Sequence, residues 1–111
     1  MNFNSIPEKI LWILQRASAV LNLIIITYIF CSLNISNLGD YFYILGWVNY
    51  ELNKFVLLVL FFSIGLHSSL GLSVILDDYI HEQKIKKFLL FSKNLFIISF
   101  WGLTGICLYL I

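Results

Sequence analysis

The chain has 111 residues, of which 60% are hydrophobic and 17% aromatic, while only 12% are charged. A soluble domain of this size needs more polar surface than this composition supplies, so we expect a membrane protein. The formal net charge of +1 argues against a nucleic-acid partner, because binding DNA or RNA requires a concentrated basic face. The single proline and six glycines leave little room for linkers, and we therefore expect one domain over residues 1–111.

Three long runs without a charged residue divide the chain, at 17–39, 55–76 and 94–111. A transmembrane helix needs about 20 apolar residues to cross ~30 Å of hydrocarbon. The first two runs satisfy this alone, and the third does so if its helix begins near Phe88 and Lys93 extends its ammonium to the membrane surface. We predict an all-α membrane protein with three transmembrane helices. These spans lie at about 13–36, 54–77 and 88–110.

The segment between the first two spans is rich in aromatic residues. Tyr41, Phe42, Tyr43, Trp47 and Tyr50 all fall within it. Aromatic side chains of this kind concentrate at the boundary between hydrocarbon and water. We expect a short interfacial helix that anchors the chain in membrane lipid, with a specific partner contact as the alternative.

Basic residues are distributed unevenly about the three spans. With three crossings, the N-terminus and the loop after the second span share one side, and Lys54 is the one basic residue on the opposite side. The basic residues on the shared side are Lys9, Arg16, Lys84, Lys86, Lys87 and Lys93. The positive-inside rule therefore predicts that the N-terminus lies in the cytoplasm or the mitochondrial matrix.

His67 is an ionisable residue about halfway along the second span. Such residues are costly in a membrane and indicate function by default. One interpretation is an axial ligand to haem, for which neutral imidazole is suited; the other is a structural hydrogen bond to a neighbouring helix. Gly71 follows one turn later, so a flat macrocycle or another helix can approach the same face closely. Ser63 and Asp78 belong to the same helical stripe, which equally fits a helix-packing face.

Arg16, Asp78 and Tyr79 are predicted to lie near the inner membrane surface. Asp78 is eleven residues after His67, or about 16 Å along a helix. A phenol, a carboxylate and a guanidinium at one depth suit the head group of a quinone, whose carbonyls accept hydrogen bonds and whose reduction takes up protons. The alternatives are a lipid phosphate contact for Arg16 and a helix-end salt bridge for Asp78. Because His67 is the one mid-membrane histidine, a haem held by two imidazoles requires a partner subunit.

Two stretches of the sequence resemble a known family. "HSSLGLSVILDDYIH" resembles the pattern His-x3-Gly-x6-Asp-Tyr of the smaller cytochrome b anchor subunit of succinate dehydrogenase, respiratory complex II. "WILQRASAV" is similar to the start of the first span of that subunit in alphaproteobacteria and mitochondria. The resemblance covers the first two spans, while the third span and the aromatic loop match only in character.

The resemblance implies roles for individual residues. His67 matches the axial ligand to the iron of haem b, with the second ligand supplied by the larger anchor subunit. Tyr79 matches the tyrosine that donates a hydrogen bond to ubiquinone, and Asp78 the acidic residue beside it. Arg16 matches the arginine near the haem propionates and the quinone, and Gly71 is expected to face the haem. The resemblance leaves Asp77, His81 and the third span without an assigned role.

The same resemblance implies a complex of several subunits. A flavoprotein subunit with FAD oxidises succinate, and an iron–sulfur subunit passes the electrons to ubiquinone. This chain, beside a larger cytochrome b anchor, contributes anchoring, half of a haem site and one wall of a quinone site, and is not expected to oxidise succinate alone. The expected location is the mitochondrial inner membrane with the N-terminus in the matrix, or alternatively a bacterial plasma membrane with the N-terminus in the cytoplasm. The competing functions are a non-catalytic packing or assembly subunit and a fumarate reductase anchor.

Overall fold

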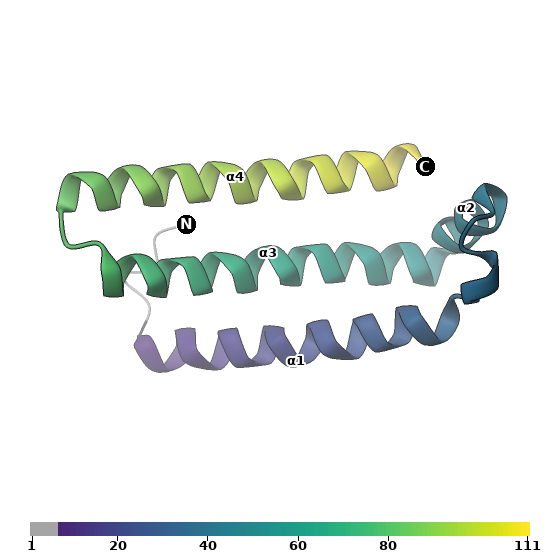
Figure 1. Cartoon of the computed structure of the whole chain (residues 1–111), viewed down its shortest axis with the longest axis horizontal. Helices are drawn as coiled ribbons and strands as arrows, with labels where there is room; N and C mark the ends of the chain where they lie inside the picture. Colours follow the sequence, from purple (N-terminus) through teal and green to yellow (C-terminus); the bar gives the residue numbers. More distant parts are fainter. Residues whose placement is uncertain (1–6) are drawn as a thin grey trace.

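The computed structural model describes residues 7–111, and every long element in it is a helix. Three of the helices are long and apolar enough to cross a membrane, which confirms the predicted all-α membrane fold (Figure 1). A short helix lies between the first two long ones, as predicted. The elements are α1 Glu8–Ser32, the 3₁₀ helix η1 Ile35–Asn37, α2 Tyr41–Asn49, α3 Glu51–Tyr79 and α4 Gln83–Leu110.

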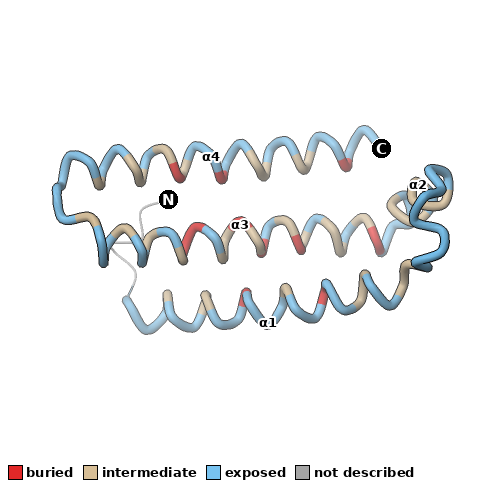
Figure 2. The backbone as a smooth tube through the Cα atoms, viewed as in Figure 1, coloured by how far each residue is buried: buried red, intermediate tan, exposed pale blue. Residues whose placement is uncertain are grey.

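The three long helices run antiparallel with α3 in the centre. Both α1 and α4 pack against α3, and α2 covers the end of α3 at which that helix begins (Figure 1). Most buried residues consequently belong to α3, as Figure 2 shows. Large apolar side chains cover the outer faces, including Phe30 and Phe96, each 71% exposed. These faces suit lipid or another membrane subunit.

The connection between α1 and α3 is fixed by helix caps. The helix α1 ends at Ser32 because Leu33 adopts an extended backbone, so the predicted range 13–36 continues past the helix into η1. The carboxylate of Asp40 then begins α2, where its Oδ1 accepts hydrogen bonds from the backbone N–H groups of Phe42 and Tyr43 at 3.0 and 3.4 Å. This is the usual role of aspartate at the N-cap of a helix.

A buried asparagine holds α2 against the long helices. Asn53 is 5% exposed; its Oδ1 accepts from Tyr28 Oη at 2.6 Å, and its Nδ2 donates to the Trp47 carbonyl at 2.9 Å. The Trp47 indole N–H in turn donates to Ser32 Oγ at 3.2 Å. Tyr41 and Phe42, by contrast, are largely exposed. In the aromatic segment, Trp47 therefore forms hydrogen bonds within the fold, whereas Tyr41 and Phe42 face outward.

Lys93 departs from the prediction that it reaches the membrane surface. The residue is 7% exposed, and its Nζ donates to Ser73 Oγ at 2.6 Å and to the Ser69 carbonyl at 3.4 Å. That prediction is wrong because residue 93 lies on the side of α4 that faces α3, which directs the side chain into the contact between the two helices.

Gly65 allows α4 to approach α3 closely. A methyl group built on Gly65 would lie 2.7 Å from Cε2 of Trp101 and closer still to Nε1. The Trp101 ring is itself stacked on Phe62, with ring centroids 4.8 Å apart and planes 23° apart. The indole therefore has little freedom to move aside.

Replacing Gly65 by alanine should destabilise the packing of α3 on α4 by about 1–3 kcal/mol, the usual cost of overpacking a close contact. Thermal unfolding of the protein in detergent, followed by near-ultraviolet circular dichroism, measures this loss. Gly102→Ala is the matched control, since a methyl group there meets nothing within 4 Å in the described chain. Equal stability of the Gly65 and Gly102 variants would contradict the packing described.

Candidate functional site

His67 lies in the contact between α1 and α3. Its Nδ1 is 3.1 Å from the Gln15 carbonyl oxygen and 3.0 Å from Ser18 Oγ. Ser18 Oγ also donates to the Gln15 carbonyl at 2.9 Å, and Ser63 Oγ donates to the Ser18 carbonyl at 3.4 Å. We refer to Gln15, Ser18, His67 and Gly71 as the histidine cluster.

The partners of Nδ1 determine which nitrogen carries the imidazole proton. A carbonyl oxygen only accepts, so the contact with Gln15 is a hydrogen bond when Nδ1 carries the hydrogen. The hydroxyl hydrogen of Ser18 is directed to the same carbonyl, which leaves its oxygen free to accept. In the neutral imidazole the lone pair then resides on Nε2. Nε2 has no hydrogen-bond partner among residues 7–111.

This arrangement bears on both interpretations of His67. The hydrogen bond from Nδ1 to α1 is what a structural histidine would make. The free lone pair on Nε2 is what a metal ligand needs, and metal-bound histidines commonly donate their other N–H to a carbonyl. The cluster therefore fits a ligand role in which α1 orients the ring.

Gly71 lies beneath the Gln15 side chain. A methyl group on Gly71 would meet Gln15 Nε2 at 3.7 Å, which is ordinary van der Waals contact. Packing within the described chain therefore does not require glycine at this position, in contrast to Gly65. The predicted stripe faces α1 at Ser63, His67 and Gly71, whereas Asp78 lies beyond α1 and is exposed.

Along the bundle axis, Arg16 lies at the level of the histidine cluster and not at the level of Asp78. It stands between Gln15 and Ser18 on α1, which places its backbone level with His67, while Asp78 is seven residues beyond Gly71, or about 10 Å along α3. Among residues 7–111 Arg16 forms no ion pair with Asp78. Its guanidinium carbon lies 5.4 Å from the centre of the Trp12 ring, in cation–π range.

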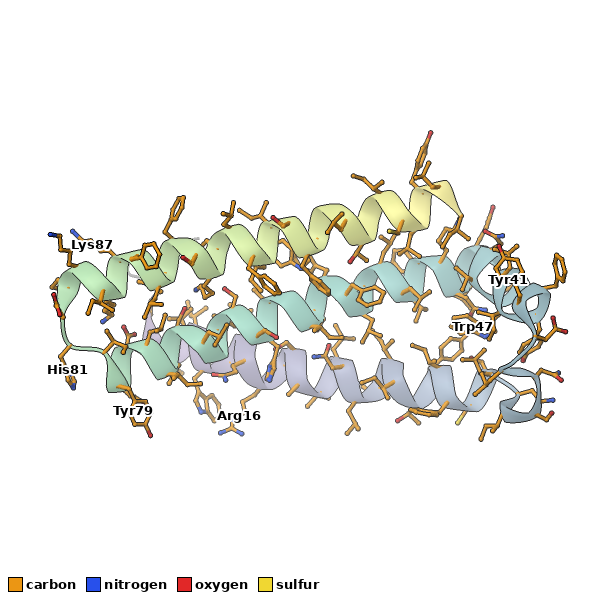
Figure 3. All side chains as sticks on the ribbon, turned by 45° about the horizontal axis from the view of Figure 1, so that its top comes forward. Arg16, Tyr41, Trp47, Tyr79, His81 and Lys87 are labelled. Atoms are coloured by element: carbon orange, nitrogen blue, oxygen red, sulfur yellow. The ribbon has the colours of Figure 1, made fainter. Side chains whose placement is uncertain are left out.

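Tyr79 ends α3 and is 77% exposed. Its side chain and that of Arg16 project outward from the same edge of the bundle, with Tyr79 nearer the α3–α4 turn, where His81 also lies (Figure 3). Asp78 and Tyr79 are thus neighbours at the end of α3, and Arg16 lies on the same half of the molecule but further along the bundle.

Asp77, to which the sequence assigned no role, forms an ion pair. Its Oδ1 lies 2.6 Å from Lys86 Nζ across the α3–α4 turn. Both residues are exposed, but successive residues on a helix point about 100° apart, so Asp77 reaches Lys86 of α4 while Asp78 points in another direction. The helix-end salt bridge considered for Asp78 belongs instead to its neighbour.

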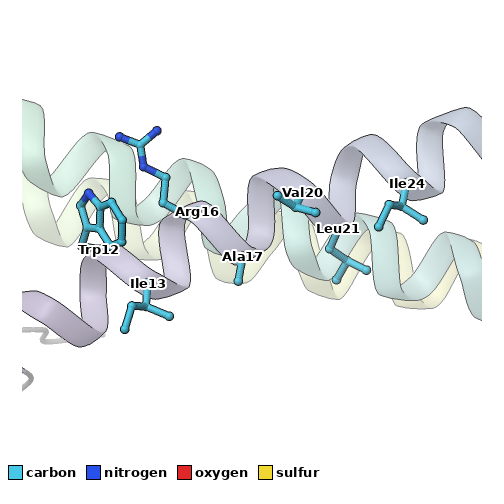
Figure 4. Close-up of a pocket in the computed structure, with 7 residues that line it drawn as sticks. All are labelled: Trp12, Ile13, Arg16, Ala17, Val20, Leu21 and Ile24. Carbon is cyan, nitrogen blue, oxygen red and sulfur yellow. The ribbon is translucent and has the colours of Figure 1, made fainter.

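A shallow apolar groove runs along the side of α1 that faces away from α3 (Figure 4). Trp12 and Arg16 lie at one end of the groove, and Val20, Leu21 and Ile24 continue it along the helix. Arg16 and Val20 are about 200° around the helix from Ser18, so the groove and the histidine cluster occupy different faces.

Gln15 and Ser18 are the site residues that sequence reasoning missed. Both belong to "WILQRASAV", but Arg16 drew attention because it is charged. Their spacing of three places them on one helix face, and this signal was available in the sequence.

Three antiparallel helices of membrane-spanning length define the class of the protein, a multi-pass membrane protein. Residues 4–106 match the family model described as the succinate dehydrogenase/fumarate reductase transmembrane subunit, and the chain belongs to this family. No curated protein matches the chain. The family confirms the predicted anchor function in a multi-subunit oxidoreductase with catalytic partner subunits.

The hydrogen bonds of His67 predict its tautomer. Nitrogen-15 NMR of the full chain without haem, at a pH at which imidazole is neutral, should show hydrogen on Nδ1 and none on Nε2. Ser18→Ala should retain this tautomer, because the Gln15 carbonyl still accepts. The exposed His81 is an internal control and should show the tautomer mixture of a free imidazole. A spectrum with hydrogen mainly on Nε2 of His67 would contradict the described cluster.

Proposed function

We propose that this chain is the smaller cytochrome b anchor subunit of a succinate:ubiquinone oxidoreductase. It would supply one axial ligand to haem b and part of the ubiquinone-reduction site. The observation that carries the proposal is the His67 ring, whose Nδ1 lies within hydrogen-bond distance of α1 while Nε2 has no partner among residues 7–111. Membership of the transmembrane-subunit family supports the same function.

His67 would hold the haem from one side only. The other histidine, His81, lies in the α3–α4 turn. It follows His67 by fourteen residues, which is about 20 Å along the axis of α3. A second imidazole would therefore come from the larger anchor subunit. When bound, haem b supplies a one-electron redox centre. The role of this chain is to orient the imidazole through Gln15 and Ser18.

Arg16 would contact the haem propionates. A guanidinium binds carboxylates in a bidentate geometry, and the register of Arg16 with the histidine cluster supports this assignment. A role for Arg16 in quinone binding as well would require the quinone to extend along the bundle edge from Tyr79 toward α1.

Tyr79 and Asp78 would form the chain's wall of the quinone site. The phenol of Tyr79 would donate a hydrogen bond to a quinone carbonyl, and the carboxyl group of Asp78 would relay protons taken up on reduction. Their exposure at the end of α3 supports access by a lipid-soluble substrate.

The catalytic partners would bind at this same end of the molecule. They are a flavoprotein subunit with FAD and an iron–sulfur subunit. Lys9, Lys84 and Lys87 lie at the end that includes the α3–α4 turn, whereas Lys54 lies near the other end. This asymmetry supports an N-terminus in the matrix of a mitochondrion, or in the cytoplasm if the membrane is bacterial. The family description also names fumarate reductase, so the reverse reaction is the second candidate function.

Replacing His67 by alanine in the assembled complex should abolish or alter the bis-imidazole absorption spectrum of the haem, because one axial ligand is lost. His81→Ala is the matched control and should leave the spectrum unchanged. An unaltered spectrum in the His67 variant would remove the ligand assignment and favour a packing subunit.

Replacing Tyr79 by phenylalanine should lower succinate–quinone reductase activity about tenfold in kcat/KM, the effect of losing one hydrogen bond of about 1.4 kcal/mol. Succinate oxidation with an artificial acceptor should be spared, since that reaction bypasses the membrane. Tyr109→Phe is the control, because Tyr109 is 86% exposed at the far end of α4. Normal quinone reduction by the Tyr79 variant would refute the proposed hydrogen bond.

A further inference from the structure

The side-chain amide of Gln15 lies unpaired at the contact between α1 and α3. Its Nε2 is 3.7 Å from the position that a methyl group on Gly71 would take, and the residue is half-buried. The backbone carbonyl of Gln15 contacts His67 Nδ1, but its amide has no hydrogen-bond partner among residues 7–111. An unpaired amide is costly within a transmembrane helix, because the hydrocarbon offers no water to bond with it. The amide therefore requires a partner outside the described residues.

The amide lies at the level of the proposed haem ligand and not at that of the proposed quinone residues. His67 and Gly71 are one turn apart on α3, about 6 Å along its axis, and Gln15 lies against both. Tyr79 is eight residues beyond Gly71, or about 12 Å further along the helix. This separation favours a ligand held at His67 over a quinone held at Tyr79 as the partner of the amide.

The residues around the amide are small. Ala19 follows Gln15 by one turn of α1, and Ser68 lies beside His67 on the same side as Gly71. Ala19 and Ser68 are both exposed, and Gly71 is half-buried. Because none of these positions carries a bulky side chain, a flat ligand can lie against this face within reach of the amide.

We propose that the side-chain amide of Gln15 donates a hydrogen bond to a propionate of the haem group held by His67. This inference rests on the proposed function. Haem b carries methyl, vinyl and propionate groups at its edge, and of these only the propionates are good hydrogen-bond acceptors. A bond to an ionised carboxylate is stronger than one to a neutral oxygen. Gln15 thus has two roles: its carbonyl orients the imidazole, and its amide holds the group bound there.

The test is the resonance Raman spectrum of the haem in the assembled complex, in which the propionate bending band reports hydrogen bonds to the propionates. Gln15→Met removes the amide and retains the length of the side chain, and the backbone carbonyl that contacts His67 stays in place. The band should move to lower frequency, because the hydrogen bond that stiffens the bend is lost. The bis-imidazole absorption spectrum should remain. Asn22→Leu is the matched control, since it removes another amide two turns along the same side of α1 and should leave the band unchanged.

Haem retention gives a second measurement. Transfer of haem from the solubilised complex to apomyoglobin should be about tenfold faster in Gln15→Met, the effect of losing one hydrogen bond to a charged group. Asn22→Leu should transfer haem at the rate of the unmodified complex. If Gln15→Met does not assemble, Gln15→Leu decides the question, since leucine is an equally good helix former without an amide.

The outcomes separate the two proposals. A normal haem spectrum with an unchanged propionate band in the Gln15 variant would overturn this inference and leave the ligand assignment intact. A raised KM for quinone with an unchanged band would also overturn it and would assign the amide to the quinone site. The absence of a haem spectrum in the unmodified complex would overturn the proposed function together with this inference.

Discussion

The arrangement of this molecule depends on the ability of α3 to accept a helix on each side. In lipid, apolar contact gives little advantage to helix association, so close packing and hydrogen bonds determine which helices meet. Ser63 and His67 bond to α1, whereas Ser69 and Ser73 bond to Lys93 of α4. Gly65 removes the side chain that would keep Trp101 away. The central helix is therefore a scaffold whose polar residues are used on both faces.

This arrangement separates chemistry by helix face. The α1 side of α3 presents an oriented imidazole, and the α4 side carries a buried cation. The exposed end of α3 carries Tyr79. One helix thus keeps its polar contacts to α1 apart from its polar contacts to α4.

The sequence predicted the elements better than their rotation about their own axes. Apolar runs of sufficient length identified three spans, and the aromatic segment indicated a short helix, because length and hydropathy are properties of the chain alone. The direction of Lys93 could not be obtained in this way, since it depends on which side of α4 meets α3. For the same reason the sequence could not show that the helix-end salt bridge, considered as the alternative role of Asp78, is formed by Asp77. Rotation is determined by packing between helices, which a single sequence does not display.

In the candidate site as well, the sequence revealed some of the residues and not others. His67 stood out because an ionisable residue in a span is costly, and Arg16 because it is charged. Gln15 and Ser18 did not stand out, although they form the contacts that orient the imidazole. Residues that position a ligand are often neutral, and only their distance to the ligand reveals them. Nδ1 of His67 contacts α1, and Nε2 has no hydrogen-bond partner among residues 7–111, so the ring is oriented by this chain while its second nitrogen stays open to a group outside the described residues.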